Sequence, residues 1–397
     1  MAYPDFSNVA REVYGKELKQ NISILIYSLA SGGAERVVSI LLEELGITYD
    51  VTLVIMNPTI HYDLPKNQKV IYLESSSPQE NGFIKLIKLP FLGLKYRRLC
   101  KKHRIDVSLS FLNRPNYIAI FSKLFANRSK IIINERSMPS LQHKYGLQGW
   151  INRHLIKTLY PKADVILTNS LGNALDLQKY FKLSDVSTFH NPFDFSILQK
   201  YSSLPVKNND LFTFISVGRL DHGKNHKLII DAIHSMDARL LILGDGILRS
   251  NLEQYIRQSN LSEKVFLIGL QQNPFEYLQQ ADCFVFSSNH EGFPNVLVEA
   301  LACNLPVIST DCDSGPREIL APNTDPFKRL TDEIELSEFG ILTPTNDVKN
   351  LECAMRLIQN DATIRYNYKH KSIQRAESSP PVHEPLTVQL LPSPPPF

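Results

Sequence analysis

The stretch that decides the fold is FTFISVGRLDHGKNHK, residues 212–227. Its first six residues, Phe212 to Val217, form a short apolar run rich in β-branched side chains, which predicts a buried strand. A polar loop follows, and helical periodicity begins at about Lys227. A strand, a loop and a covering helix are the repeating unit of a parallel α/β sheet.

The same alternation continues on both sides of this stretch. Strands are predicted downstream at Arg239–Leu243, Lys264–Ile268, Cys283–Ser287 and Val307–Thr310, and upstream at Ile22–Tyr27, Val51–Met56, Asp106–Phe111, Ile131–Asn134 and Asp164–Thr168. Helical stretches such as Ala34–Leu45 lie between them. We therefore expect an α/β chain with two Rossmann-like, doubly wound parallel-sheet domains. The expected ligand site is the cleft between the two domains, because the carboxyl ends of the parallel strands face it.

Domain boundaries follow from composition. We expect an N-terminal extension at 1–20, a first Rossmann-like domain at 21–195 and a second at 196–375, with a polar linker ending near Asn209. Residues 376–397 contain seven prolines and little helical periodicity, so this tail is expected to be disordered.

Charge and cysteine content exclude several classes of protein. The 43 basic and 40 acidic residues nearly balance, which argues against nucleic acid as a partner. The five cysteines form no C-x-x-C pair and suit reduced thiols in a cytoplasm. The first twenty residues have no apolar signal core, and no apolar run is long enough for a membrane span.

Two cations leave the strand end at residues 218–224. Gly218 and Arg219 follow the strand directly, and Lys224 precedes the helix. An arginine fork and a lysine point charge together suit a diphosphate. The alternative is a pair of solvated loop cations, but a glycine beside the arginine at the carboxyl edge of the sheet favours binding.

A second motif, HEGFPNVLVEA at residues 290–300, places a helix start after the strand that ends at Ser287. Pro294 suits the first helical position. The free N–H groups of the helix can bind phosphate, with Glu291 and Glu299 as hydroxyl acceptors on either side. Each glutamate alone is more often a surface carboxylate, so their joint setting carries the hypothesis.

A glycine pair, Gly32-Gly33, lies between the first strand and its helix in SLASGGAER, residues 28–36. Missing Cβ atoms let a ligand approach the backbone of such a turn. The G-x-G-x-x-G fingerprint is absent, and a simple tight turn explains the pair equally well.

These motifs, taken in this order, resemble those of the retaining glycosyltransferases of the GT-B fold. The resemblance includes Gly244-Asp245-Gly246 and Pro306-Val307-Ile308. Within that fold it is specific to the large fourth family, also called glycosyl transferases group 1. The resemblance extends from Ile22 to about Asn360. Similar bacterial enzymes transfer N-acetylhexosamines, such as N-acetylgalactosamine, to polyprenyl-diphosphate-linked glycans or lipopolysaccharide precursors.

The resemblance implies roles for individual residues. Arg219 and Lys224 would hold the diphosphate of a nucleotide diphospho-sugar donor, most readily UDP-linked, and Glu299 would take the ribose hydroxyls. Glu291 would meet the transferred sugar, and Arg219, Lys224 and Glu291 form the expected catalytic set. The expected donor site further contains Gly32, Gly33, Gly218, Gly244, Gly292, Phe293, Pro294 and Asn295. Many relatives have a histidine late in the first domain, where this chain offers Glu135 and Arg136 on the acceptor side.

We expect no metal and no cofactor. Asp311-Cys312-Asp313 mimics the D-x-D of a different transferase fold. However, two cations and a helix N-terminus already neutralise a diphosphate. The eleven histidines show no zinc-ligand spacing.

A basic and apolar segment, residues 83–105, contains no acid. It suits peripheral contact with an anionic membrane, on the cytoplasmic face of the inner membrane if the acceptor is lipid-linked. An ordinary covering helix with a basic exposed side explains the pattern equally well.

Three other functions remain open. A two-lobed sugar-binding protein would also close parallel-sheet domains on a ligand, but it would not need Arg219 and Lys224 beside a helix N-terminus. A hydrolysing UDP-sugar epimerase of the same fold would release an epimerised free sugar without any acceptor. A catalytically inactive relative is suggested by the tail, which lacks the final helix expected after Arg375.

Overall fold

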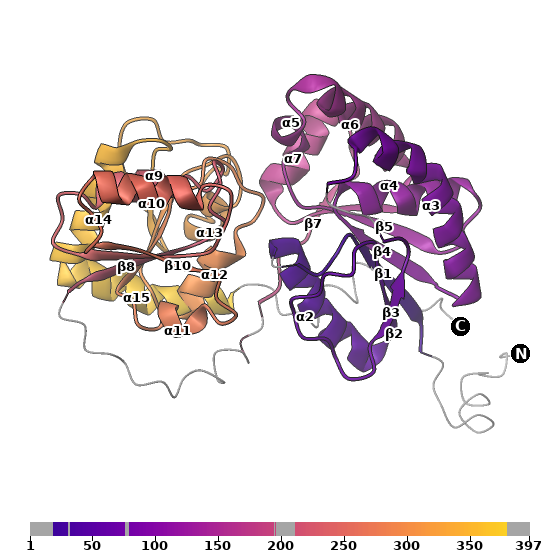
Figure 1. Cartoon of the computed structure of the whole chain (residues 1–397), viewed down its shortest axis with the longest axis horizontal. Coiled ribbons are helices and arrows are strands. Elements are labelled where there is room, and N and C mark those ends of the chain that lie inside the picture. The colour runs from indigo at the N-terminus through magenta and orange to yellow at the C-terminus, as the bar shows by residue number, and fades with distance from the viewer. Residues whose placement is uncertain (1–18, 31, 76–78, 194, 196–210, 379–397) are drawn as a thin grey trace, which may run out of the picture. The chain divides into compact units, whose positions relative to one another are not determined.

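The computed structural model describes residues 19–30, 32–75, 79–193, 195 and 211–378, and these form two compact units. The first unit includes the described residues up to Thr168 and Leu177–Ser187. The second includes Asn169–Asp176 and the described residues from Thr188 onward. Figure 1 colours the chain from indigo in the first unit to yellow at the end of the second.

The first unit contains a seven-stranded sheet in the order β3-β2-β1-β4-β5-β6-β7. Its strands are β1 (Asn21–Ile26), β2 (Asp50–Ile55), β3 (Lys69–Tyr72), β4 (Val107–Phe111), β5 (Lys130–Glu135), β6 (Val165–Thr168) and β7 (Ser187–Thr188). The strands from β3 to β6 pair in parallel. The helices are α2 (Gly33–Thr48), α3 (Gly82–Lys102), α4 (Asn113–Leu124), α5 (Pro139–Gln142) and α6 (Gly146–Leu159). Helix α7 (Leu171–Phe181) is divided between the units, with the residues from Leu177 onward in the first.

The second unit contains a seven-stranded sheet in the order β10-β9-β8-β11-β12-β14-β13. Its strands are β8 (Thr213–Val217), β9 (Arg239–Leu243), β10 (Val265–Gly269), β11 (Cys283–Phe286), β12 (Val307–Thr310), β13 (Glu335–Leu336) and β14 (Ile341–Thr343). All are parallel to their neighbours except β13, which is antiparallel to β14. The helices are α9 (His226–Ala232), α10 (Arg249–Gln258), α11 (Phe275–Leu278), α12 (Asn295–Ala302), α13 (Pro316–Leu320), α14 (Val348–Asn360) and α15 (Ala362–Glu377).

Strand order reverses between β8 and β11, because β9 and β10 extend the sheet on one side of β8 and β12 extends it on the other. In open parallel sheets such a reversal opens a crevice at the carboxyl ends of the two strands. The loops after β8 and β11 therefore emerge at the position where this fold class binds ligands.

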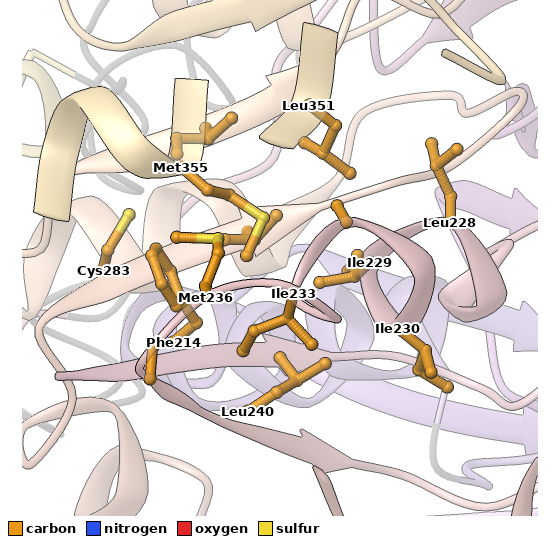
Figure 2. Close-up of a cluster of buried hydrophobic side chains, with 14 of the residues drawn as sticks. Phe214, Leu228, Ile229, Ile230, Ile233, Met236, Leu240, Cys283, Leu351 and Met355 are labelled. Carbon is orange, nitrogen blue, oxygen red and sulfur yellow. The ribbon is translucent and has the colours of Figure 1, made fainter. Parts of the chain in front are cut away.

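The core of the second unit holds these strand ends in place. Figure 2 shows Leu228, Ile229 and Ile233 packed with Leu351 and Met355 of α14. Phe214, Leu240 and Cys283 contribute from strands β8, β9 and β11, and all of these side chains are buried. Burial of each large aliphatic side chain is worth about 1.5–3 kcal/mol, so the helix that follows the β8 loop is firmly anchored.

The prediction of two parallel-sheet domains is confirmed. The predicted strands fall within two residues of their observed bounds, but β3, β7, β13 and β14 are not predicted. β7 and β13 have only two residues each. β3 is short and only half-buried, and β14 has three residues. Pro294 is the N-cap of α12 and not its first helical residue.

Three predicted segments fall mainly outside the described residues. These are the N-terminal extension at 1–20, the linker ending near Asn209 and the tail at 376–397. Of the tail, only the end of α15 and Ser378 are described. Among the described helices, none combines the length and the apolar character needed to span a bilayer.

Candidate active site

The loop after β8 is locked against the loop after β9 by two glycines. The Gly218 amide donates to Leu243 O at 2.9 Å, and the Leu220 amide donates to Asp245 O at 3.0 Å. Gly244 has a φ of +136°, and a Cβ there would lie 2.0 Å from Gly218 O. Only glycine fits this crossing, so Gly218 and Gly244 set the backbone from which Arg219 extends.

Lys224 joins this loop to the loop after β11. Its Nζ donates to Glu291 Oε1 at 2.6 Å, and both side chains are mostly buried. The same ammonium lies 5.0 Å from the ring centroid of Phe286, the last residue of β11. Ser287 Oγ donates to Lys224 O at 2.8 Å. Glu291 and Phe286 thus hold the ammonium, and Ser287 holds the backbone of the same residue, all from the neighbouring strand and its loop.

Arg219 is placed differently, because its side chain is 77% exposed and its nearest acid is Asp221, with Nε 3.6 Å from Oδ2. An exposed guanidinium near a weak partner is free to swing onto an incoming anion. Arg219 and Lys224 therefore supply one mobile and one fixed cation.

Asparagines connect the same two loops further out. Asn225 has a left-handed φ of 47°, and its Nδ2 donates to Asn289 Oδ1 at 3.2 Å. The Asn289 amide donates to Gly223 O at 2.8 Å. These bonds fix the Arg219–Asn225 loop against the end of β11.

His226 opens α9 beneath the Gly218 loop. Its side chain is buried, and Nδ1 lies 3.5 Å from Ser216 Oγ. Burial, and then the charge of Lys224, lower the pKa of His226 to about 4. A neutral imidazole therefore fills this position at physiological pH and adds no charge to the site.

The loop that leads into α12 is held from behind. Ser314 Oγ donates to Gly292 O at 2.8 Å, and a Cβ on Gly315 would lie 2.8 Å from the same oxygen. The Phe293 ring stacks on His190 with a centroid separation of 5.0 Å, and Asn191 Nδ2 donates to Phe293 O at 3.3 Å and to Asn295 Oδ1. The turn thus keeps a fixed shape.

The N-terminus of α12 has no side-chain cap. Uncapped N–H groups and the helix dipole favour an anion at this end. Glu299 lies half-buried about one turn into α12, which packs against α15. Just beyond the end of α12, Leu305 O accepts a hydrogen bond from Ser372 Oγ of α15 at 2.7 Å. Burial, and then the charge of Glu299, raise the pKa of Cys303 to about 12.

Asp311 is occupied by an ion pair. Arg317 Nη2 lies 2.7 Å from Asp311 Oδ2, Arg317 Nε donates to Oδ1 at 3.1 Å, and both side chains are buried. Leu330 N donates to Oδ2 at 3.1 Å. This carboxylate therefore holds α13 and the following loop, and within the described residues no cluster of three potential metal ligands occurs.

In the first unit, Gly32 is the N-cap of α2 and Gly33 its first residue. A Cβ on Gly32 would lie 2.2 Å from a carboxylate oxygen of Glu35, which folds back over the helix start. Tyr62 OH donates to Gly32 O at 3.2 Å. The Glu35 carboxylate therefore occupies the space beside this turn. The predicted place of Gly33 in the donor site stays a prediction.

Glu135, at the end of β5, is completely buried. Its Oε2 accepts from Tyr160 OH at 2.8 Å, and its Oε1 accepts from Arg136 N at 2.9 Å and Ser137 Oγ at 3.0 Å. Burial raises the pKa of Glu135, and these bonds oppose that rise. Such a carboxylate shapes its loop. Burial likewise lowers the pKa of Arg136 to about 10, against the charges of Glu35 and Glu135. Contact of either residue with an acceptor stays a prediction.

The structure thus brings together Gly218, Arg219, Lys224, Gly244, Glu291 and the start of α12 within one unit. It adds supporting residues that the sequence motifs did not indicate, namely Asn289, Phe286, Ser314, His190 and Asn191. Asn289, a polar residue just after a predicted strand, carried a usable signal. The others act across long sequence separations.

Comparison with known proteins identifies the family of this chain. The model of the family "Glycosyl transferases group 1" matches residues 200–377, which include Arg219, Lys224, Glu291 and helix α12. A Campylobacter jejuni protein is 40% identical over 364 residues, covering 90% of this chain and 95% of the relative. It is an N-acetylgalactosamine-N,N'-diacetylbacillosaminyl-diphospho-undecaprenol 4-alpha-N-acetylgalactosaminyltransferase.

A second Campylobacter jejuni protein is 28% identical over 90% of this chain and 93% of its own. It is an alpha-1,4-N-acetyl-D-galactosaminyltransferase acting on a GalNAc-containing undecaprenol diphosphate. Among solved structures, HepE from Anabaena in complex with UDP and glucose matches with a TM-score of 0.70 at 18% identity, over 91% of this chain and 95% of that one. Sucrose-phosphate synthase from Thermosynechococcus elongatus matches with a TM-score of 0.74 at 17% identity, over the same shares of the two chains. These likenesses show the GT-B fold.

Proposed function

Because the chain belongs to the group 1 glycosyltransferases, we propose that it transfers N-acetylgalactosamine from UDP-N-acetylgalactosamine to a polyprenyl-diphosphate-linked glycan. The 40% identity to the Campylobacter jejuni transferase over 95% of that relative supports both the sugar and the class of acceptor. A lipopolysaccharide-type glycan is the second acceptor class, supported by the weaker likeness to lipopolysaccharide 1,6-galactosyltransferases.

One observation carries the assignment of the donor site: Lys224 Nζ lies 2.6 Å from Glu291 Oε1. A nucleotide sugar joins a diphosphate directly to a sugar ring, so its site needs a cation and a hydroxyl acceptor side by side. Lys224 and Glu291 meet this requirement from two different loops. We assign the diphosphate to Lys224, Arg219 and the start of α12, and the transferred sugar to Glu291.

The nucleoside follows along α12. Glu299 lies about one turn into this helix, and its carboxylate would accept hydrogen bonds from the ribose hydroxyls. One charge-assisted hydrogen bond of this kind is worth about 1.5–3 kcal/mol.

In the proposed mechanism, the acceptor hydroxyl attacks the anomeric carbon from the side that the diphosphate leaves. The carbon–oxygen bond to the diphosphate breaks with its electron pair going to the phosphate, and the hydroxyl proton passes to a phosphate oxygen. Attack and departure on the same side retain the configuration. Arg219, Lys224 and the N–H groups of α12 are preorganised donors for the charge that develops, so the proposed step uses no metal.

The acceptor fixes where the enzyme works. A polyprenyl-linked glycan lies in a membrane, and we propose that the protein works at the cytoplasmic face of the inner membrane through peripheral contact. No part of this proposal involves nucleic acid.

The test offers a panel of nucleotide sugars to the purified chain, with membrane lipid extract as the acceptor source and EDTA present. We expect UDP release with UDP-N-acetylgalactosamine, and a glycolipid heavier by one N-acetylhexosamine in mass spectrometry. An epimerised free sugar produced without acceptor would instead assign the UDP-sugar epimerase. Donor binding with neither product would assign a sugar-binding protein or an inactive relative.

A further inference from the structure

The exposed face of α3 changes character halfway along the helix. Its first half exposes Phe83, Ile84, Ile87 and Phe91, and its second half exposes Lys95, Arg98, Lys101 and Lys102. The spacing of three or four residues places both sets on one side of the helix. Phe83 is 66% exposed and Phe91 is 72% exposed. Large apolar side chains so far from the core are not explained by folding of the unit.

The helix itself is firmly packed. Its opposite side buries Leu89, Leu92 and Tyr96, and Tyr96 OH hydrogen bonds with Ser23 Oγ and Ser108 Oγ, both at 2.7 Å. The helix also packs against α4. The exposed apolar residues are therefore presented on a rigid support.

Helix α6 repeats the pattern. It exposes Leu147 and Trp150 in its first half, followed by His154 and Lys157. The Trp150 indole is 65% exposed and stacks on His154. A Cβ on Gly82, the first residue of α3, would lie 3.0 Å from Gln148 Nε2 of α6. The apolar beginnings of the two helices thus lie side by side, and both belong to the first unit.

Charge on these helices has one sign. Together α3 and α6 contain nine lysines and arginines and no acidic residue. An apolar cluster with an indole, backed by cations, complements the boundary between acyl chains and anionic headgroups.

We propose that Phe83, Ile84, Ile87, Phe91, Leu147 and Trp150 form an insertion surface, which enters the acyl region of an anionic bilayer while the basic halves of α3 and α6 contact the headgroups. This inference rests on the proposed function, because an acceptor that is embedded in a membrane would bring the bilayer to this surface. It differs from a purely electrostatic contact, because membrane binding through inserted apolar side chains persists at high salt concentration.

The experiment measures flotation of the full chain with vesicles of phosphatidylglycerol and phosphatidylcholine. The test variant is Phe83→Ser with Phe91→Ser. The matched control is Ile47→Ser with Tyr366→Ser, which removes side chains that are 66% and 71% exposed elsewhere. The test variant should bind about a hundredfold more weakly, since burying one aromatic side chain is worth about tenfold or more. The control should bind like the wild type.

Salt separates the two components of the contact. At ~1 M sodium chloride, where the Debye length is about 3 Å, the wild type should keep measurable binding and the Phe83/Phe91 variant should lose it. Arg98→Glu with Lys102→Glu should weaken binding at low salt and leave the salt-resistant part. Thermal unfolding confirms that each variant is folded.

Equal flotation of the wild type and the Phe83/Phe91 variant would overturn the insertion surface. So would a wild-type dimer in sedimentation that this variant dissociates, with no vesicle binding by either, because the surface would then join two copies of the chain. A further arm assays transfer to a short-chain acceptor in solution. Retained turnover there, with loss on vesicle-embedded acceptor, supports the inference. If the wild type transfers no sugar at all, the proposed function fails and flotation still decides the surface.

Discussion

Replacing Lys224 by methionine removes the positive charge that joins the two loops of the site and keeps an unbranched side chain. In the wild type, Nζ donates to Glu291 Oε1 at 2.6 Å, and the Lys224 and Glu291 side chains are only 20% and 13% exposed. The variant therefore loses a charge-assisted hydrogen bond and leaves a mostly buried carboxylate without its cation.

Two magnitudes follow. Loss of a hydrogen bond to a charged, mostly buried group should lower the free energy of unfolding by about 1–3 kcal/mol. Loss of a donor to the departing diphosphate should lower turnover by about 10² to 10³. The double variant Lys224→Met, Glu291→Gln no longer leaves a buried charge behind, so it should recover part of the stability and none of the turnover.

The assay combines denaturant unfolding with steady-state release of UDP for the wild type, both single variants and the double variant. Turnover of Lys224→Met within about threefold of the wild type, at equal substrate saturation, would refute a catalytic role for this cation. Turnover that recovers together with stability in the double variant would make Lys224 a structural partner of Glu291 only.

Four further predictions address the rest of the site. Arg219→Ala should keep the free energy of unfolding within about 0.5 kcal/mol of the wild-type value, because the side chain is exposed, while turnover should fall by about 10². A denaturant melt and a rate measurement check the two values, and an unchanged rate would contradict the catalytic role. Glu299→Gln should weaken UDP binding in calorimetry by about tenfold or more, and an unchanged affinity would exclude the ribose role. Gly244→Ala would place a Cβ 2.0 Å from a backbone oxygen at a φ of +136°. It should therefore lower the free energy of unfolding, measured in a denaturant melt, by about 2 kcal/mol or more. The control Gly46→Ala, which has open space around the added Cβ, should not destabilise the protein. Burial lowers the pKa of His226 to about 4, so as pH falls from about 6.5 to 4 this residue takes up a proton in the unfolded chain but not in the folded chain. Over this pH range the free energy of unfolding should therefore fall by about 3 kcal/mol more in the wild type than in His226→Asn. Equal pH dependence of the two proteins would contradict the buried neutral imidazole.

Much of the fold could be predicted from local patterns. Runs such as Ile22–Ile26 and Phe284–Phe286 are central parallel strands, and burial on both faces gives them a continuous apolar signal. β3 at Lys69–Tyr72 is an edge strand with half-buried residues, so its signal is weak. β14 is fully buried but has only three residues, too few for periodicity.

The clustering of the predicted donor-site residues of the second unit could be anticipated because several of them follow strands directly. Gly218, Arg219 and Glu291 each lie within five residues of a strand end, and parallel strands bring their carboxyl ends to one edge. The supports were not predictable, since the contacts of Ser314 with Gly292 and of Asn191 with Phe293 depend on the finished tertiary fold. Nor could sequence show that Glu135 is buried under Tyr160, because burial of a polar residue leaves no local periodicity.

The basic segment at 83–105 shows the same limit. Its composition indicates a covering helix and a membrane contact equally well. In the structure, one face of α3 packs on the core, as expected of a covering helix. The exposed face is apolar in its first half and basic in its second.

A crystal structure of the chain with UDP bound tests the central claim most directly. The account predicts the β-phosphate within hydrogen-bond distance of Lys224 Nζ and the Arg219 guanidinium, at the uncapped start of α12, with the ribose against Glu299. UDP bound elsewhere, or bound with neither Lys224 nor Arg219 in contact with its phosphates, would contradict it.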